Sequence, residues 1–428
     1  MAFQQVEVLE VRAWGRTVGA LAPVPNSDLS AFEFARAWRA PDLSPLLMPV
    51  GSRRRTWVFP GLPRETFHGL PPLVAGSAPD DFGNAVINAA LQREGLPPEF
   101  VRPIDRLAYV GTRALGALTF HPAQSPASEP TAIEMAHLVE GARLAIRGSL
   151  AEGQRTEALS EIFSVGVSAG GARAKAIIAL DPVTHEVRAG GVDAPQGYEQ
   201  WLLKFDGVGE DSELGRGGEY GRIEYAYSLM AAQAGVTMSE SRLLEEGGRA
   251  HFMTRRFDRP GVNGERIHMQ SLNDLSGLDF RQRGAHDYGA LFQAANQLGI
   301  DAGDQLFRRM VFNVLASNHD DHTKNHAFLL PENGPWELAP AYDLTFAYNP
   351  QGFWTSQHLL SVNGRFTDIR RTDLLAVADR YLVGGAARIV REVQEAVDAF
   401  PEFARAAGVA LDRARGIKDR LKEVRAGL

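Results

Sequence analysis

The sequence predicts an α+β protein with a small N-terminal α/β subdomain, a sheet-rich lobe and an all-helical C-terminal lobe. In the first 122 residues, short alternating segments such as VEVLEVRAWG mix with turn-rich stretches such as GLPPLVAGSAPDDFGN, which is typical of a small mixed unit. Three apolar runs, FSVGV, AKAIIAL and WLLKF, follow and predict strands of one sheet. Helical periodicity dominates from about residue 222 onward. The 428 residues are enough for about two or three domains.

Two boundaries divide the chain into segments 1–122, 123–259 and 260–428. The polar, proline-containing stretch HPAQSPASEP at 121–130 is the expected linker after the first segment. Thr131 and Glu134 then form a capping-box pattern, which predicts the start of a helix. The stretch TRRFDR at 254–259 ends an apolar patch, and we expect it to connect the second segment to the third.

The composition is that of a soluble globular protein: 44% hydrophobic and 23% charged residues favour neither disorder nor a fibrous architecture. No apolar run reaches the ~18 residues of a membrane span, and the start, MAFQQVEVLEV, does not resemble an export signal. The absence of cysteine excludes disulfides and zinc–thiolate sites and agrees with a cytoplasmic location. The net charge of −7 argues against broad non-specific nucleic-acid binding, and we interpret Arg53, Arg54 and Arg55 as solvated surface.

Residues 317–330, SNHDDHTKNHAFLL, first suggest a metal site. His319, His322 and His326 would share one face of a continuous helix and could then hold zinc. However, the apolar stripe of the preceding helix, which begins at Leu306, ends at Leu315. The polar residues that follow favour helix ends and turns, so a zinc triad carried by a helix loses its geometry.

A second spacing in the same stretch indicates phosphoryl transfer. Asp320 is followed by Asn325, by two short segments typical of strands with a turn between them, and by Asp343. In kinases, an Asp contacts the acceptor hydroxyl, an Asn five residues later reaches magnesium, and a second Asp binds magnesium. Magnesium is a hard ion that prefers such oxygen ligands. The Asp-x4-Asn spacing alone also fits a simple polar turn.

The accompanying parts of a kinase site occur upstream. The small-residue loop GVSAGGARAK at 166–175 would let backbone N–H groups approach a phosphate, although it is neither a Walker A loop nor a G-x-G-x-x-G motif. Lys204 in WLLKFD would contact the phosphates, and Glu224 on the next helix is its candidate partner. Alone, the loop fits a hairpin turn and Lys204 an edge lysine. Together, their order predicts a bilobed protein-kinase-like fold.

These motifs together resemble the HipA family, the serine/threonine kinase toxins of bacterial type II toxin–antitoxin systems. The resemblance lies in SAGGARAKA, WLLKFD, RRFDR, HMQSLNDL, NHDDHTKNHAFLL and LAPAYDL. The N-terminal segments GALAP, LPPLVAGSAPDDFGNAVIN and RLAYVGTRALGAL look like the small N-terminal subdomain of the same family. The resemblance therefore covers nearly the whole chain and implies a HipA-type fold.

The resemblance also implies roles for individual residues. Asp320 and Asn325 would be catalytic, Asn325 and Asp343 would bind Mg2+, and Ser168 would be autophosphorylated as an off-switch. The backbone of Arg256 and Phe257 would meet adenine. The full nucleotide-binding set for ATP would be Ser168, Ala169, Gly170, Gly171, Ala172, Arg173, Lys175, Lys204, Arg256, Phe257, His322, Lys324, Asn325 and Asp343.

Two positions depart from the family pattern. Ala174 stands before Lys175 where the family commonly has proline, which should loosen the loop without removing any chemistry. Asp321 adds a carboxylate next to Asp320, where relatives can have a small residue, and the pattern does not explain it. Asp320 keeps the role of base, because only Asp320 has the five-residue offset to Asn325.

The family further implies partners. It implies phosphorylation of an aminoacyl-tRNA synthetase, which would inhibit translation, and a small DNA-binding, HipB-like antitoxin through which the chain would reach operator DNA. Two rivals stay open. A metal-dependent hydrolase would use His319, Asp320, His322 and His326, and a pseudokinase would act as a co-repressor without transferring phosphate.

Overall fold

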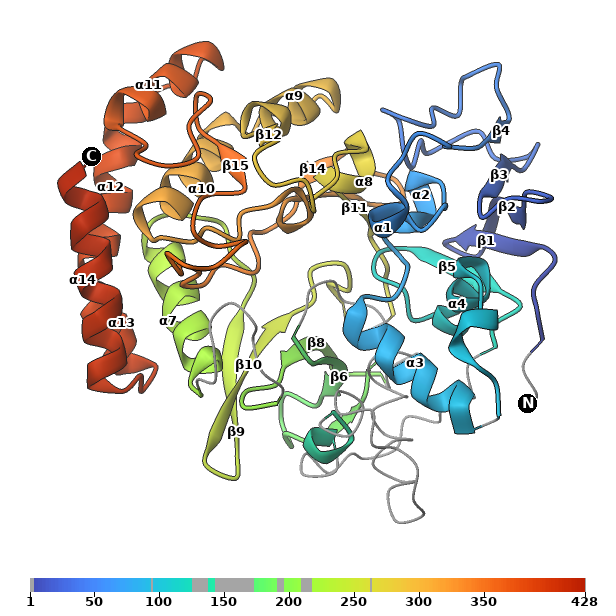
Figure 1. Ribbon diagram of the computed structural model, residues 1–428, viewed down its shortest axis with the longest axis horizontal. Coiled ribbons are helices and arrows are strands. Elements are labelled where there is room, and N and C mark those ends of the chain that lie inside the picture. Colours follow the sequence, from blue (N-terminus) through green and yellow to red (C-terminus); the bar gives the residue numbers. More distant parts are fainter. Residues whose placement is uncertain are drawn as a thin grey trace.

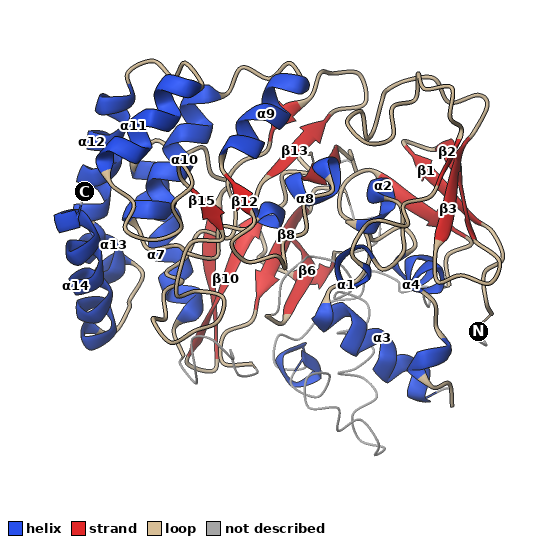
Figure 2. Ribbon diagram, turned by 45° about the horizontal axis from the view of Figure 1, so that its top comes forward, coloured by secondary structure: helices blue, strands red, loops and turns tan. Residues whose placement is uncertain are grey.

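The computed structural model describes residues 4–93, 95–124, 138–142, 173–190, 196–208, 218–261 and 264–427. Three groups of elements follow one another along the chain (Figure 1). Figure 2 shows the helices of the C-terminal lobe gathered on one side, the N-terminal sheet at the opposite end, and a second sheet between them.

The N-terminal group is built on a five-stranded antiparallel sheet in the order β4-β3-β2-β1-β5. In β1, buried and half-buried residues alternate, so one face of the strand packs into the core as the sequence pattern predicts. The strands are β1 Leu9–Ala13, β2 Arg16–Pro23, β3 Ser30–Phe34, β4 Thr56–Trp57 and β5 Leu118–His121. The helices are α1 Arg64–Phe67, α2 Pro72–Ala75, α3 Asp81–Arg93, η1 Pro98–Phe100 and α4 Pro103–Val110.

The second group is a five-stranded antiparallel sheet in the order β7-β6-β8-β10-β9, on which one long helix, α7 Tyr220–Gln233, packs. The strands are β6 Lys175–Leu180, β7 Val187–Ala189, β8 Glu199–Lys204, β9 Ser241–Glu246 and β10 Arg249–Arg255. The predicted runs AKAIIAL and WLLKF correspond to β6 and β8. The predicted strand FSVGV and the helix start at Thr131 lie outside the described residues.

The C-terminal group is predominantly helical but carries short strands beside the predicted catalytic loop. A three-stranded sheet has the order β11-β13-β14, and β12 pairs with β15 in parallel. The strands predicted for AFLL and WELA correspond to β13 and β14. The strands are β11 His268–Ser271, β12 His286–Asp287, β13 Ala327–Leu330, β14 Glu337–Leu338 and β15 Leu360–Ser361. The helices are α8 Leu272–Ser276, α9 Gly289–Gln297, α10 Gly303–Leu315, η2 Thr323–Asn325, α11 Arg371–Arg380, α12 Ala386–Asp398, α13 Phe400–Ala406 and α14 Leu411–Gly427.

The two large sheets do not have separate hydrophobic cores. One buried cluster runs from the N-terminal sheet, through Leu9 and Phe120, into the second sheet at Ile178 and Trp201. A separate cluster fills the helical lobe. The N-terminal group and the second sheet therefore share one core, and removing either would expose apolar surface of the other.

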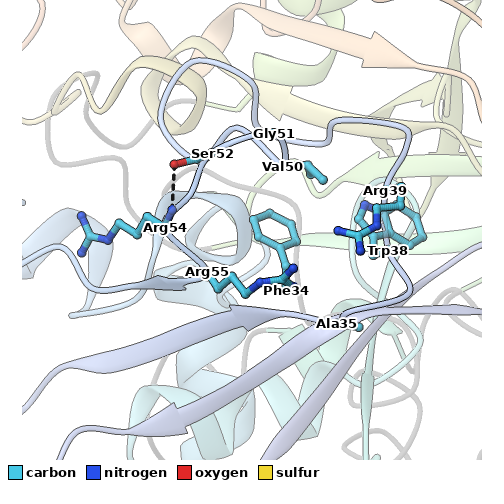
Figure 3. Close-up of a pocket in the computed structure, with 9 residues that line it drawn as sticks. All are labelled: Phe34, Ala35, Trp38, Arg39, Val50, Gly51, Ser52, Arg54 and Arg55. Atoms are coloured by element: carbon cyan, nitrogen blue, oxygen red, sulfur yellow. Dashed lines mark hydrogen bonds between the residues drawn. The ribbon is translucent and has the colours of Figure 1, made fainter.

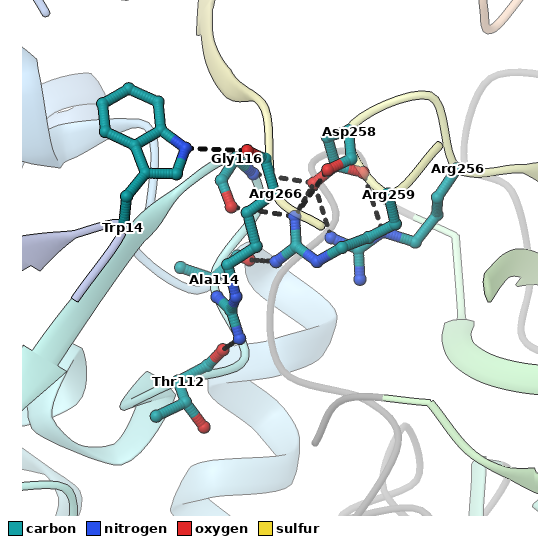
Figure 4. Close-up of polar contacts among 8 residues, drawn as sticks. All are labelled: Trp14, Thr112, Ala114, Gly116, Arg256, Asp258, Arg259 and Arg266. Carbon is teal, nitrogen blue, oxygen red and sulfur yellow. Dashed lines mark hydrogen bonds and ion pairs between the residues drawn. The ribbon is translucent and has the colours of Figure 1, made fainter. Parts of the chain in front are cut away.

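Buried polar contacts also join the N-terminal group to the segment after β10 (Figure 4). Asp258 Oδ2 accepts a hydrogen bond from Gly116 N at 2.7 Å, and Arg259 donates to the carbonyls of Gly116 and Ala114 at 2.9 and 3.1 Å. Arg256 and Arg259 both pair with Asp258. The two arginines lower the pKa of the buried Asp258 carboxyl, although burial opposes this. The segment TRRFDR therefore holds the N-terminal group as well as connecting the two lobes.

Candidate functional site

The loop after α10 has the course that the sequence predicts. Helix α10 ends at Leu315, Ser317 adopts a left-handed conformation with φ 50°, and the chain forms the short η2 helix before β13. The loop does not gather its histidines. His319 packs on His358 and Tyr348, and His326 packs edge-on against Tyr288. The histidine cage therefore does not form, and among the described residues no cluster of three or more His, Cys, Asp or Glu could hold a metal.

Asp321 has a structural role that the sequence did not reveal. Its side chain is fully buried and accepts hydrogen bonds from the Tyr288 hydroxyl at 2.8 Å and from Leu359 N at 2.7 Å. His358 Nδ1 lies 2.8 Å from the same carboxylate. Burial opposes ionisation, but His358 and the donated hydrogen bonds outweigh it and lower the pKa of Asp321. Asp321 thus fastens the loop to the segment before β15.

Asp320 faces the other way, with 43% of its side-chain surface exposed. Asn325 Nδ2 donates to the Asp320 carbonyl at 2.7 Å, and His322 Nε2 lies 3.7 Å from Asp320 Oδ1. The surrounding protein partly desolvates the carboxyl and raises its pKa to about 6; the charge of Asp343 adds to this effect, while His322 opposes it. The Asp-x4-Asn spacing therefore places Asp320 and Asn325 side by side, with a carboxylate more basic than usual.

Lys204 joins the two lobes at the same place. Its Nζ lies 2.5 Å from Glu224 Oε1 on α7 and 2.5 Å from Asp343 Oδ1, which follows β14. Burial would lower the pKa of Lys204, but the two carboxylates outweigh burial and raise it. Lys204 and Lys175 in turn hold the pKa of Asp343 well below its usual range, against the effect of burial. Asp343 has φ 58°, a left-handed backbone that turns the chain sharply at this residue.

The loop before β6 is described only from Arg173 onward, so Ser168, Ala169, Gly170, Gly171 and Ala172 lie outside the described residues. The Arg173 guanidinium lies 4.3 Å from the centre of the Tyr220 ring. Its positive charge acts to lower the pKa of both Asp320 and Asp343. Lys175 is buried and forms an ion pair with Asp80 of the N-terminal group at 3.4 Å. Sequence reasoning missed Asp80, because this residue lies 95 positions upstream of Lys175, in the N-terminal group.

The remaining predicted nucleotide contacts lie near the connector. The Arg256 guanidinium is turned to Asp258, and the Arg256 N–H is already bonded to the carbonyl of Gln200 at 2.9 Å, so neither group faces a nucleotide. The expected contact between the Arg256 backbone and adenine stays a prediction, and the Arg256 carbonyl is the group that would make it. Phe257 packs on Tyr342 with ring centres 5.7 Å apart, and Lys324 Nζ lies 4.6 Å from the centre of the Phe280 ring.

A pocket of about 210 Å³ lies elsewhere, in the N-terminal group beside β3 (Figure 3). Arg53, Arg54 and Arg55 are exposed at this surface, as the sequence suggested. None of the site residues described above contributes to this pocket, so it is separate from the Lys204–Asp343 site. Its lining residues are Phe34, Ala35, Trp38, Arg39, Val50, Gly51, Ser52, Arg54 and Arg55.

Comparisons with known proteins decide the family. The HipA-like C-terminal domain matches residues 167–407, more than half of the chain, and the HipA N-terminal domain matches residues 9–121. The chain belongs to the HipA family. Y4dM, a proposed kinase of Sinorhizobium fredii, is 23% identical to this HipA-family chain in a match 368 residues long that covers 79% of this chain and 77% of Y4dM.

A solved HipA structure shows the same fold. It is the Shewanella oneidensis toxin–antitoxin complex of HipA with HipB and operator DNA, at 15% identity and a TM-score of 0.62. The match covers 98% of this chain and 96% of that one. The predicted HipA-type, kinase-like α+β fold is therefore confirmed. In the described part of this HipA-family chain, no helix has the length and apolar character needed to cross a membrane.

Proposed function

We propose that this HipA-family chain is a Mg-ATP-dependent serine/threonine protein kinase. The observation that carries the proposal is the position of Lys204, whose ammonium group lies 2.5 Å from both Glu224 and Asp343. A strand lysine paired with a helix glutamate, beside a magnesium-binding aspartate, is the arrangement that protein kinases need for phosphoryl transfer. Asp320 and Asn325 stand on the adjoining loop, within reach of the charge of Asp343.

The residues at the site fit Mg-ATP. Asp343 and Asn325 offer carboxylate and amide oxygens, which are the donors that magnesium prefers. Lys204, Lys175 and Arg173 bring positive charge to the same place, where phosphates would bind. When bound, ATP supplies the phosphoryl group and Mg2+ neutralises the charge that develops on it. The chain therefore provides both a set of oxygen donors and a set of cations.

Asp320 is the proposed base for the acceptor hydroxyl. With a pKa of about 6, its carboxyl is ionised at pH 7 yet accepts a proton more readily than an ordinary aspartate. Asn325 holds the backbone of Asp320 through the 2.7 Å hydrogen bond to its carbonyl. Asp321 keeps the rest of the loop in place from the buried side. Asp320 would orient the serine or threonine hydroxyl and take up its proton during transfer.

The resemblance supports three further proposals about the chain. We assign residues 1–122 to the N-terminal subdomain, 123–259 to the ATP-binding lobe and 260–428 to the catalytic lobe. Ser168 would be the inactivating autophosphorylation site, because a phosphate there adds about two negative charges and would displace the loop from the phosphate site. Phe257, His322 and Lys324 would complete the nucleotide pocket with the carbonyl of Arg256.

The biological role we propose is that of the toxin in a toxin–antitoxin pair. The chain would phosphorylate an aminoacyl-tRNA synthetase and so inhibit translation in the bacterial cytoplasm. It would bind a small HipB-like antitoxin and reach operator DNA through that partner. The Shewanella oneidensis complex of HipA, HipB and operator DNA supports the antitoxin and DNA partners.

One experiment tests the kinase proposal against a pseudokinase that acts only as co-repressor. The purified, unphosphorylated protein is incubated with Mg-ATP, alone and with a cell lysate, and phosphate is mapped by mass spectrometry. We expect phosphate on Ser168 and on a lysate protein, both abolished by Asp320→Asn. Ser168→Ala should remove only the first. A wild-type protein that labels neither itself nor a lysate protein would refute the kinase and leave the co-repressor.

A further inference from the structure

A carboxylate from the N-terminal group reaches into the proposed nucleotide site. Asp80 precedes α3, and its Oδ2 lies 3.4 Å from Nζ of Lys175, the first residue of β6. The two side chains keep only 8% and 5% of their surfaces exposed. They are thus a buried ion pair between two parts of the chain that are 95 residues apart, and buried charges need such partners.

The strand register puts Lys175 beside the phosphate-binding lysine. Lys175 and Lys204 stand directly opposite each other in the antiparallel pair β6–β8, and directly opposite residues share one face of a sheet. Two like charges at such positions repel each other unless carboxylates separate or neutralise them. Lys204 has Glu224 and Asp343 for this purpose, and Lys175 has Asp80.

The Asp80 side chain is held in place by its own helix. Its Oδ1 accepts a hydrogen bond from Gly83 N at 2.7 Å, and its carbonyl accepts from Asn84 N at 2.7 Å, so Asp80 is the N-cap of α3. One carboxylate oxygen therefore caps the helix while the other faces Lys175. The partial positive charge of the helix N-terminus further favours the ionised carboxylate. Asp80 is a fixed negative charge, not a mobile surface group.

Electrostatics at Lys175 agrees with this geometry. Burial lowers the pKa of Lys175, and the charge of Lys204 adds to this effect. Asp80 and Asp343 oppose it. Without Asp80, the ammonium form of Lys175 would lose the nearby carboxylate whose charge stabilises it more than that of Asp343.

We infer that Asp80 is a positioning residue of the nucleotide site, which holds Lys175 charged and aimed at the phosphates of ATP. The N-terminal group then completes the kinase site and does not only pack against it. This inference rests on the proposed function, because it takes ATP as the ligand.

The test uses the full-length protein and a substitution that removes charge alone. Asp80→Asn keeps a residue type that caps helices well, so α3 should persist while the ion pair is lost. We expect the KM for ATP to rise roughly tenfold, as for the loss of one charged hydrogen bond, with kcat changed less than KM. Asp80→Glu should recover part of the affinity. Circular dichroism and thermal unfolding would confirm that each variant is folded.

A matched control lies next to Asp80 in the sequence. Asp81 has 76% of its side chain exposed, and its ion pair with Arg281 is distant, at 3.9 Å. Asp81→Asn removes the same charge from the same helix start and should leave the KM for ATP within twofold of wild type. The second control is Lys175→Met, in which adding Asp80→Asn should have no further effect on KM.

The outcomes separate this inference from the proposed kinase activity. Binding of a fluorescent ATP analogue is measured beside phosphate transfer, so that a wild type that binds the analogue without transferring phosphate refutes the kinase but still tests Asp80. An unchanged or lower KM or Kd in Asp80→Asn would overturn the inference, a lower value meaning that Asp80 competes with the phosphates. Equal effects of Asp80→Asn in the wild-type and Lys175→Met backgrounds would also overturn it, as would a wild type that binds no nucleotide.

Discussion

The hydroxyl of Tyr288 donates a 2.8 Å hydrogen bond to Asp321, the residue directly after the proposed base. Tyr288 is itself fully buried and accepts a hydrogen bond from Asn313 Nδ2 at 2.8 Å. The chain Asn313–Tyr288–Asp321 therefore ties helix α10 to the loop that follows it. Two adjacent aspartates consequently have separate tasks, one structural and one chemical, and substitutions should separate them.

Asp321→Asn should lower stability strongly. The carboxylate accepts hydrogen bonds from Tyr288 and Leu359, and an amide group would place donors against donors in a buried site. We expect a loss of about 3 kcal/mol in the free energy of unfolding, measured by urea denaturation. Asp301→Asn, an exposed change, is the control and should shift the free energy by less than about 0.5 kcal/mol. A fully stable Asp321→Asn protein would contradict the bracing role.

Asp320→Asn should reduce phosphate transfer and leave the stability of the fold unchanged. Its side chain is 43% exposed and its removal leaves the buried network of Asp321 intact. We expect phosphate transfer to fall about 100- to 10,000-fold, the usual contribution of a general base, while the urea midpoint stays near that of wild type. Steady-state kinetics with a purified acceptor protein measures the first effect. Transfer within threefold of wild type would exclude Asp320 as the base.

Lys204→Met should abolish nucleotide-dependent activity. The substitution removes the cation that lies 2.5 Å from Asp343 and leaves Glu224 without its buried partner. We expect phosphate transfer to fall about 100-fold or more, because the charge on the phosphates is no longer compensated. A metal-dependent hydrolase would keep its activity in the same variant. The control is Arg242→Met, which removes a cation of the same sheet that pairs with Glu240 at 2.6 Å and lies over the Trp201 ring.

Asp258→Ala should loosen the N-terminal group. It leaves Arg256 and Arg259 buried without their shared carboxylate and breaks the hydrogen bond from Gly116. Loss of one partner of a buried charge pair costs about 3–5 kcal/mol. Limited proteolysis should then cut the chain between the N-terminal group and β6 faster than in wild type. Equal cleavage rates would show that the shared hydrophobic core alone holds the two parts together.

Buried histidines should make the fold sensitive to mild acid. Burial lowers the pKa of His268 from 6.5 to about 4, although its hydrogen bond to Leu43 opposes this effect. Because the unfolded chain then binds more protons, stability is complete above pH 6.5 and falls as pH drops from about 6.5 to about 4. The loss from this residue reaches about 3 kcal/mol. His268→Gln should reduce the slope of the unfolding free energy against pH in that window, and an unchanged slope would contradict the assignment.

The candidate site could be proposed from the sequence, because phosphoryl transfer requires particular residue types in a particular order. Lys204, Asp320, Asn325 and Asp343 follow from the spacing and the resemblance, and the structure brings Lys204 and Asp343 into contact. The strands β6, β8, β13 and β14 could also be predicted, since each is a short apolar run bounded by turn residues.

Contacts between distant segments could not be predicted. Asp321 looked like an unexplained second carboxylate because its partners, Tyr288 and His358, lie 33 and 37 residues away. Asp80 gave no signal, because an aspartate before a helix is also an ordinary cap. The direction of the Arg256 side chain could not be predicted, because it depends on the buried carboxylate of Asp258, which Gly116 holds from the N-terminal group. Patterns within a short stretch of sequence do not indicate which distant residue a side chain will contact.

The sharing of one hydrophobic core between the N-terminal sheet and the second sheet has a consequence during synthesis. The ribosome makes Leu9 and Phe120 before Ile178 and Trp201. The N-terminal group therefore emerges with an apolar face that stays exposed until the second sheet is made and packs on it. The charges at the site arrive in the order Asp80, Lys175, Lys204 and finally Asp343. A chain that is released before residue 343 therefore lacks the Lys204–Asp343 contact, and we expect such incomplete translation products to transfer no phosphate.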